Sequence, residues 1–255
     1  MRVSRFFIDA PLTPAQHITL PPNLVNYIVN VLRLNSGDDI VLFNGKGYGK
    51  ESADREKPGE FTASLTEVKK RSVSAIINHF VEKNIESPLK IHLFQGISRA
   101  ERMDFSIQKA VELGVHSITP VLTQRSNSGK FNHQRLEKKH QHWQGVALSA
   151  CEQSGRTRLV RVNPPIQVQQ ISDYTADINL LLAPDASNKL CDLKHSTPES
   201  VNVFIGPEGG LNSTEIELAI DAQYKKMKLG PRILRTETAG LAVLSVLQYL
   251  WGDLT

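Results

Sequence analysis

The sequence lacks the features that define several protein classes. No apolar run approaches the length needed to span a bilayer, and the opening residues, MRVSRFFIDAPL, contain too short an apolar segment for a signal peptide. Only two cysteines occur, Cys151 and Cys191, without the paired spacing of a disulfide framework or a zinc site. We therefore expect a cytoplasmic protein with reduced thiols and no bound metal.

Common phosphate-binding and metal-binding motifs are also missing. No G-x-x-x-x-G-K-[ST] segment occurs, and in Gly45–Gly49 (GKGYG) the third glycine position of a dinucleotide motif is Lys50. No helical pattern follows that segment, so we interpret it as a glycine turn. His140 and His142 are not spaced to share one helix face, and no third ligand is near them in sequence, which favours a polar surface over a metal site.

The charge balance is weakly basic. Thirty Lys and Arg residues against 26 Asp and Glu residues give a net charge of +4 and a pI of about 9.0, which does not by itself indicate nucleic-acid binding. Local basic clusters are more suggestive, although a solvated surface is the better explanation for any single one. These clusters lie at Lys69–Arg71, Lys138–Lys139, Arg156/Arg158/Arg161 and Lys225/Lys226/Lys228.

Apolar patterning divides the chain into two parts. In residues 1–82, short strand-like runs alternate with turn signals, which predicts a small, mostly β domain. Residues 83–88 (KNIESP) are polar and end in proline, as linkers often do. In residues 89–255, strand-like runs alternate with helical patterns, which predicts an α/β domain with a parallel sheet covered by helices on both faces.

Individual elements can be placed within this pattern. Helices are expected at about 98–113, 134–153 and 236–251, and strands at 91–95, 117–122, 178–183, 201–205 and 227–229. Ser98 with Glu101, and Asn212 with Glu215, have the spacing of capping boxes at helix starts. Lys109 and Glu112 are one turn apart and predict a surface ion pair.

The last predicted helix is apolar nearly all round. One buried face would not need so many apolar residues, so the helix is expected to be covered both by its own sheet and by a partner subunit. Its apolar residues are Leu241, Ala242, Val243, Leu244, Val246, Leu247, Leu250 and Trp251.

Two glycine-bearing loops near the C-terminus are the most informative segments. Gly206–Gly210 (GPEGG) and Leu229–Thr238 (LGPRILRTET) each follow a strand-like run and precede a helix, which is where α/β proteins bind ligands. Glycine lets a ligand lie against bare peptide groups, and the prolines stiffen both loops before anything binds. Both loops are therefore predicted to line a binding site.

These two segments, extended to GPEGGLNSTEIE and LGPRILRTETAGLA, resemble the signature of the ribosomal small-subunit methyltransferase E family of SPOUT-class RNA methyltransferases. Other segments follow in the family's order: Arg5–Phe7, Val31–Arg33, Lys109–Gly114, Glu152–Arg156 and Trp251–Leu254. The resemblance implies methylation of uracil N3 in 16S ribosomal RNA of the small ribosomal subunit, with S-adenosylmethionine as methyl donor. It also implies a SPOUT fold with a C-terminal trefoil knot, a PUA-like RNA-binding β-barrel in residues 1–82, and a homodimer.

The resemblance further implies which residues bind the cofactor. The family binds adenosine among three loops, where backbone groups read the adenine edge and apolar side chains cover its faces. At the matching positions here are Leu182, Ala183, Pro184, Gly206, Pro207, Glu208, Gly209, Gly210, Leu229, Gly230, Arg232, Ile233, Leu234 and Thr236. Asp185 has no predicted role.

Methyl transfer to uracil N3 predicts further roles in the same loops. The N3 lone pair must be aligned with the methyl group and the N3 proton removed. Because the deprotonated ring carries negative charge on O2 and O4, a fixed guanidinium would stabilise it, and Arg235 is the candidate. Glu208 or Glu237 is expected to act as base or to orient the ring. The structural alternative is that Glu237 favours a helix start and pairs with Arg235.

For RNA, the resemblance implies phosphate contacts by Arg5, Arg33, Lys46 and Arg125. Two alternative functions stay open. One is a related SPOUT methyltransferase acting on tRNA or a ribose 2′-hydroxyl, and the other is a non-catalytic ribosome-assembly protein that binds RNA. The intact loops, with Arg235 and Glu208, argue against a non-catalytic protein.

Overall fold

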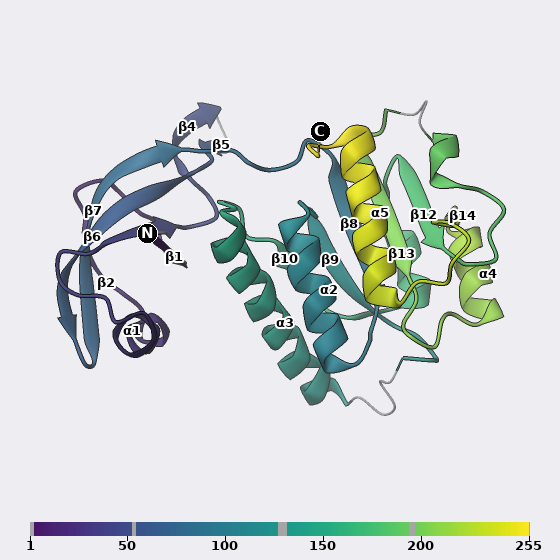
Figure 1. The fold of residues 1–255 in the computed structure, drawn as a ribbon, viewed down its shortest axis with the longest axis horizontal. Helices are drawn as coiled ribbons and strands as arrows, with labels where there is room; N and C mark the ends of the chain where they lie inside the picture. Colours follow the sequence, from purple (N-terminus) through teal and green to yellow (C-terminus); the bar gives the residue numbers. More distant parts are fainter. Residues whose placement is uncertain (1–2, 53–54, 127–131, 194–196, 255) are drawn as a thin grey trace. The chain divides into compact units, whose positions relative to one another are not determined.

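The computed structural model describes residues 3–52, 55–126, 132–193 and 197–254, which form two compact units (Figure 1). The first unit comprises the chain up to Glu86 together with Cys151–Leu159, and the second comprises Ser87–Ala150 and the chain from Val160 onward. The second unit differs from the predicted domain of residues 89–255 in two respects. It begins at Ser87 instead of residue 89, and it leaves out residues 151–159, whose contacts group them with the first unit.

The first unit is built on a mixed five-stranded sheet in the order β1-β3-β6-β7-β2. Its strands are β1 (Ser4–Phe7), β2 (His17–Thr19), β3 (Asp39–Phe43), β6 (Gly59–Lys69) and β7 (Ser72–Glu82), beside a separate pair, β4 (Tyr48–Ser52) and β5 (Arg55–Lys57). Every second residue of β6 from Gly59 to Leu65 is buried, as the period of a strand requires. The described pairings run from β1 to β2 without closing a ring, so the barrel stays a prediction.

A helical segment in the first unit was missed by the sequence patterns. It consists of α1 (Pro22–Asn26) and a π-helical continuation, η1 (Tyr27–Leu32). Proline suits the first turn of a helix because the amide hydrogen it lacks would have no partner there. The segment ends at Arg33, whose φ of 55° is left-handed. At only three turns, it was too short for its apolar period to stand out among strand-like runs.

The segment 151–159 is fixed to the first unit by hydrogen bonds. The Phe7 amide donates to Glu152 Oε1 at 3.0 Å, and the Thr157 hydroxyl donates to the Lys83 carbonyl at 3.2 Å. Arg156 was expected in a solvated basic cluster, but its side chain is buried and forms an ion pair with Glu86. That expectation was wrong because the partner of Arg156 lies 70 residues away in sequence.

The second unit contains a seven-stranded sheet whose pairings are all parallel, as predicted. The order is β10-β9-β8-β13-β12-β14, with β11 also pairing with β9. The strands are β8 (Lys90–Gly96), β9 (Ser117–Leu122), β10 (Arg161–Val162), β11 (Ile166–Gln167), β12 (Ile178–Leu182), β13 (Ser200–Ile205) and β14 (Lys225–Met227). Two short 3-10 turns, η2 (Val168–Asp173) and η3 (Leu190–Leu193), connect them.

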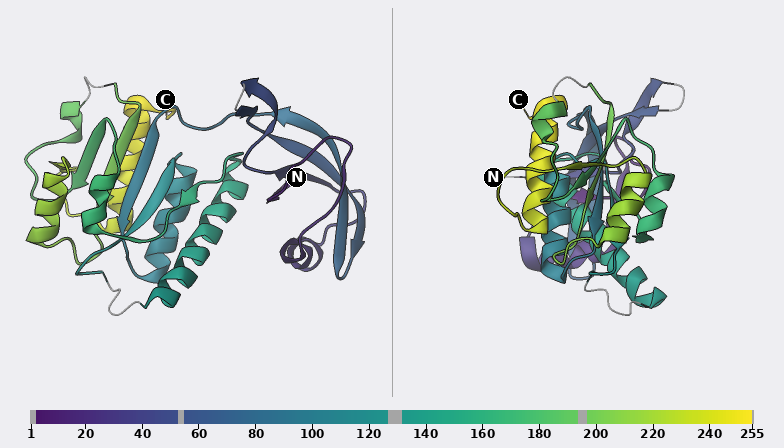
Figure 2. Two further views of the ribbon diagram at one scale, coloured as in Figure 1. Left: turned by 180° about the vertical axis from the view of Figure 1, so that it is seen from behind. Right: turned by 90° about the vertical axis from the view of Figure 1, so that its right-hand side faces the viewer.

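Helices cover both faces of this sheet. They are α2 (Ala100–Glu112), α3 (His133–Ser154), α4 (Ser213–Asp221) and α5 (Thr236–Trp251). Figure 2 shows α2 and α5 together on one face and α4 on the other. Lys109 and Glu112 form the expected surface pair at 2.8 Å. No helix in the described ranges is long and apolar enough to cross a membrane.

The two predicted capping boxes had different outcomes. Asn212 and Glu215 form theirs at the start of α4. At α2 the cap position is Arg99, because the buried Ser98 hydroxyl instead donates to the Gly96 carbonyl at 3.2 Å. The Arg99 backbone amide donates to Glu208 Oε1 at 3.0 Å. A carboxylate that is distant in sequence thus takes the place predicted for Glu101.

Helix α5 has two distinct faces. Val243, Leu244 and Leu247 are completely buried within the second unit, whereas Val246 and Tyr249 are 37% and 71% exposed. Leu244 and Leu247 therefore belong to the core of the protomer itself. Cover of the exposed face by a partner subunit stays a prediction.

A largely enclosed histidine makes the stability of the second unit depend on pH. His92 of β8 stacks on Phe94, with ring centroids 4.1 Å apart, and its Nε2 lies 2.7 Å from Thr119 Oγ1. Burial, and secondarily the charge of His116, lowers the pKa of His92 from 6.5 to about 4. The unfolded chain binds the His92 proton more tightly than the folded chain does. The stability that neutral His92 contributes to the fold is therefore fully present above pH 6.5 and is lost as the pH falls towards 4.

We expect His92→Phe to reduce this acid sensitivity. Between pH 7.5 and pH 5.0 the native protein should lose about 2 kcal/mol more stability than the variant, since phenylalanine cannot take up a proton. Urea unfolding followed by tryptophan fluorescence measures this, because both tryptophans, Trp143 and Trp251, lie in the second unit. Exposed His133→Phe is the matched control. Equal losses in the native protein and His92→Phe would contradict the assignment.

Candidate functional site

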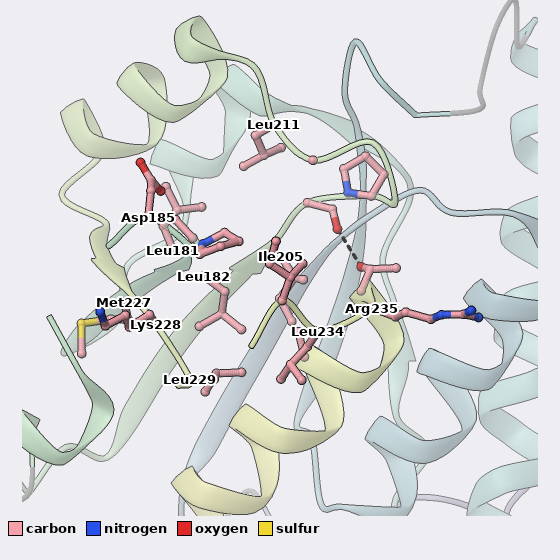
Figure 3. A pocket seen from close by; sticks show the side chains of 18 of the residues that line it. Leu181, Leu182, Asp185, Ile205, Leu211, Met227, Lys228, Leu229, Leu234 and Arg235 are labelled. Atoms are coloured by element: carbon pink, nitrogen blue, oxygen red, sulfur yellow. Dashed lines mark hydrogen bonds between the residues drawn. The ribbon is translucent and has the colours of Figure 1, made fainter. Parts of the chain in front are cut away.

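A pocket of about 630 Å³ lies where strands β12, β13 and β14 end (Figure 3). Three loops surround it, following β12, β13 and β14, as the sequence predicted. Every predicted cofactor residue except Gly209 lines the pocket. The lining residues that the sequence did not predict are Arg102, Leu181, Asp185, Ile205, Leu211, Ile216, Met227, Lys228 and Ala239.

One end of the pocket is mainly apolar. Figure 3 shows Leu182, Leu229 and Leu234 gathered on one side of the cavity, with Leu211 on the opposite side. Parallel pairing of β12 with β13 and β14 brings Leu182 and Met227 to the same sheet edge. Such a surface can cover the two faces of a flat heterocycle.

Adjacent glycines in the loop after β13 have different surroundings. A Cβ on Gly210 would meet nothing within 4 Å, and its φ of +71° is in the left-handed region that favours glycine. A Cβ on Gly209 would lie 2.9 Å from the Cβ of Arg125. Gly210 therefore belongs to the pocket wall, while Gly209 faces Arg125 and lies outside the lining.

A buried hydroxyl joins the two glycine-bearing loops. The Thr236 hydroxyl, at the start of α5, donates to the Gly206 carbonyl at 2.7 Å and accepts from Gln95 Nε2 at 3.0 Å. Gln95, at the end of β8, also donates to the Gly96 carbonyl at 3.1 Å. A Cβ on Gly96 would lie only 2.5 Å from the Pro207 nitrogen, so glycine is required for this close approach.

Two carboxylates and one arginine form a charged cluster beside the loops. Arg102 Nη1 lies 3.4 Å from Glu208 Oε1, and Arg102 Nε lies 3.9 Å from Glu237 Oε1. The glutamate side chains are only 17% and 14% exposed, and the Oε2 atom of each is buried without a hydrogen-bond partner among the described residues. Arg102 was not predicted from the sequence. Its position just after the end of β8, at the same sheet edge as the loops, was the available signal.

Arg235 is exposed and occupies the N-cap position of α5, where its side chain makes no capping hydrogen bond. Its side chain extends towards α2 and away from the leucines of the pocket (Figure 3). In the part of the chain that the structure describes, it forms no ion pair, and Glu237 pairs with Arg102 instead. The structural alternative for Arg235, pairing with Glu237, is therefore absent.

Asp185, which had no predicted role, lines the pocket and pairs with a lysine. Its Oδ2 lies 2.7 Å from Lys226 Nζ, and this hydrogen bond is the main reason that the pKa of Asp185 is lowered. The pair links the loop after β12 to strand β14.

The four predicted RNA contacts differ in their surroundings. Arg5 is 9% exposed, pairs with Glu60 at 2.8 Å and lies over the ring of Phe43, so its guanidinium packs inside the first unit instead of facing RNA. Arg125 is exposed but braces the loop after β13 by donating to the Gly209 carbonyl at 3.2 Å. Arg33 and Lys46 are exposed, and their RNA contacts stay predictions.

Two histidines of α3, His140 and His142, form ordinary polar contacts. His140 Nε2 lies 2.7 Å from the Val162 carbonyl, and His142 Nε2 lies 2.8 Å from Asp104 Oδ2. Within the described ranges, no three His, Cys, Asp or Glu residues are grouped so that they could hold a metal.

Comparison with known proteins decides the family. The family described as RNA methyltransferase domain matches residues 85–248, and the RNA methyltransferase PUA domain matches residues 20–48. The ribosomal RNA small subunit methyltransferase E of Buchnera aphidicola is 36% identical over all of this chain and 99% of its own length. That of Bacillus subtilis is 31% identical over 97% of this chain and 96% of its own length. This chain belongs to the ribosomal RNA small subunit methyltransferase E family.

Solved structures agree with the assignment to the methyltransferase E family. The Neisseria gonorrhoeae member, bound to S-adenosylmethionine, has a TM-score of 0.87 and 38% identity over the full length of both chains. A Legionella pneumophila methyltransferase with bound S-adenosylmethionine has a TM-score of 0.90 and 38% identity, covering 99% of this chain and 100% of its own. The predicted family and enzyme class, an S-adenosylmethionine-dependent RNA methyltransferase, are confirmed.

The pocket of this methyltransferase E family member fits that cofactor. Its volume is within the usual range for small-molecule sites, roughly 300–1,000 Å³, and its apolar side chains suit the faces of adenine. Gly210 leaves open space where a side chain would fill the cavity. Exposed backbone groups of the three loops can bond the polar edge of the base.

Gly210→Val should abolish S-adenosylmethionine binding, because the side chain would enter the pocket and disfavour the positive φ. Isothermal titration calorimetry measures the affinity. Gly37→Val is the matched control, since Gly37 also has a positive φ and open space around its Cβ but lies in the first unit. Unchanged affinity in Gly210→Val, or equal loss in both variants, would remove Gly210 from the site.

Proposed function

We propose that this protein transfers the methyl group of S-adenosylmethionine to N3 of a uracil in 16S ribosomal RNA of the small ribosomal subunit. The observation that carries the proposal is the location of the cluster of Arg102, Glu208 and Glu237. Arg102 and Glu208 line the same pocket as the leucines that suit adenosine, and Glu237 pairs with Arg102 beside it. The printed names of the relatives, ribosomal RNA small subunit methyltransferase E, support RNA of the small subunit as substrate.

The apolar end of the pocket is proposed to orient the methyl donor. When bound, S-adenosylmethionine supplies an electrophilic methyl group on a positively charged sulfur. Leu182, Leu229 and Leu234 would hold its adenosine, while Gly206 and Gly210 offer backbone groups. Fixing donor and uracil in line can contribute roughly 7–11 kcal/mol to lowering the barrier.

The charged end is proposed to handle the proton and the charge of the uracil. A carboxylate oxygen accepts the proton from N3, and the N3 lone pair then forms the bond to the methyl carbon as the bond from that carbon to sulfur breaks. Glu237 is the better candidate base, because Glu208 already accepts the Arg99 amide. The exposed Arg235 is proposed to stabilise the negative charge on O2 and O4.

RNA is proposed to bind through exposed basic residues, including Arg33 and Lys46 of the PUA-like first unit. The protein is proposed to act in the cytoplasm, where small ribosomal subunits are found.

We further propose a C-terminal trefoil knot. Its support is the bond from Thr236 to Gly206, which holds the start of α5 against the loop that follows β13.

A homodimer is proposed through the exposed face of α5. Val246 and Tyr249 on α5 and Phe105 on the neighbouring α2 are apolar or aromatic and 37–71% exposed. Aromatic residues in such patches are typical of subunit interfaces. A symmetric dimer would bury this face against its own copy.

Arg235→Ala should lower the single-turnover methylation rate by about a hundredfold, as when one donor to a developing oxyanion is removed. Arg235→Lys should restore only part of the rate, because a point ammonium cannot make a planar two-pronged contact. The assay uses small ribosomal subunits lacking the methyl group, at saturating enzyme and cofactor, with the methylated nucleotide identified by mass spectrometry.

Exposed Arg161→Ala is the control for that experiment. A near-normal rate for Arg235→Ala would refute its role. Product on tRNA or at a ribose hydroxyl would refute the proposed substrate.

Tyr249→Asp should convert the dimer to a monomer, because it places a charge in the apolar centre of the proposed interface. Light scattering gives the mass directly. Ile220→Asp, on α4 at the opposite face of the sheet, is the matched control and should stay dimeric. A mass of two subunits for Tyr249→Asp would exclude this face as the interface.

A further inference from the structure

Arg102 contacts both candidate carboxylates, yet the proposed chemistry gives it no direct role. It lies in the first turn of α2, and its partners come from two other segments of the second unit. Glu208 lies in the loop after β13, and Glu237 lies in the first turn of α5. One guanidinium therefore spans three segments that are distant in sequence.

The chemistry of arginine suits this position. Its planar fork presents donors in several directions, so Nη1 can face Glu208 while Nε faces Glu237. A lysine has one compact ammonium and could not hold both carboxylates at these separations. The Arg102 side chain is 34% exposed, so solvent limits what the ion pairs add to stability. Fold stability alone is thus a weak reason for the arrangement.

The two glutamates depend on Arg102 to different degrees. Glu208 is also fixed by the Arg99 amide at 3.0 Å. For Glu237, Arg102 is the ion-pair partner that the structure describes, at the longer distance of 3.9 Å. The Oε2 atoms of both are buried without hydrogen-bond partners in the described residues, an arrangement that is costly unless water or a bound ligand reaches the oxygen.

We propose that Arg102 is a positioning residue that holds Glu237, and secondarily Glu208, so that a free carboxylate oxygen is available to the uracil N3 proton. The inference rests on the function proposed above. Arg102 itself would not contact the reacting atoms. It would act by fixing the orientation of Glu237, which lacks the additional backbone contact of Glu208.

Replacing Arg102 with glutamine should lower the single-turnover rate on small ribosomal subunits by about a hundredfold, because the base is no longer held in its productive orientation. The dissociation constant for S-adenosylmethionine, measured by calorimetry, should change by less than about threefold, since the leucines and glycines of the pocket are untouched. Arg102→Lys should give an intermediate rate, because one ammonium keeps a single ion pair.

Lys109→Gln is the matched control. Lys109 lies on the same helix, has the same side-chain exposure of 34% and also pairs with a glutamate, Glu112, but is outside the pocket lining. Its rate should stay within about twofold of the native value, as for most surface substitutions. Thermal unfolding of every variant separates loss of fold from loss of positioning, and Arg102→Lys provides the test if Arg102→Gln does not fold.

A double-mutant cycle identifies the residue through which Arg102 acts. Combining Arg102→Gln with Glu237→Gln should slow the reaction no more than the slower single variant, because both changes remove the same positioned carboxylate. Full additivity, or a native rate for Arg102→Gln, would overturn the inference. The native protein is assayed in parallel, so absence of uracil methylation by the native protein would refute the proposed function instead.

Discussion

The hydrogen bond from the Thr236 hydroxyl to the Gly206 carbonyl is the contact on which the site depends. It joins the loop after β13 to the start of α5, and Gln95 ties both to the end of β8. Three segments that are far apart in sequence are thereby fixed at one edge of the sheet. The side chains of Thr236 and Gln95 are buried, and breaking a bond in such a network leaves polar atoms without water or partner.

Charge is arranged around the same junction. Two carboxylates face a single arginine, and one of them, Glu208, also takes the place of the local cap at the start of α2. Glu208, in the loop after β13, thus accepts a hydrogen bond from the backbone amide at the start of helix α2. The apolar half of the pocket and its charged half share the loop after β13, so the position of that loop affects the cofactor region and the glutamates together.

Features fixed by local pattern were predictable from sequence. Strand β9 and helix α5 have the predicted bounds, because apolar period and turn residues specify them locally. The three pocket loops followed from glycine placement after strand-like runs and from the family resemblance. Features that depend on distant partners were not predictable. In the sequence, Arg5 and Arg156 resemble ordinary surface cations. In the structure their side chains are buried and form ion pairs with Glu60 and Glu86. Arg102 was missed for the same reason.

The segment 151–159 determines when the first unit can be completed. Its side chains supply partners for the Phe7 amide, the Lys83 carbonyl and the Glu86 carboxylate. During synthesis, at about 5–20 residues per second, the N-terminal sheet would wait several seconds for these partners to emerge. The order of folding therefore does not follow the order of the chain. A truncation after residue 86 would leave the carboxylate of Glu86 without its arginine and the Phe7 amide without its acceptor.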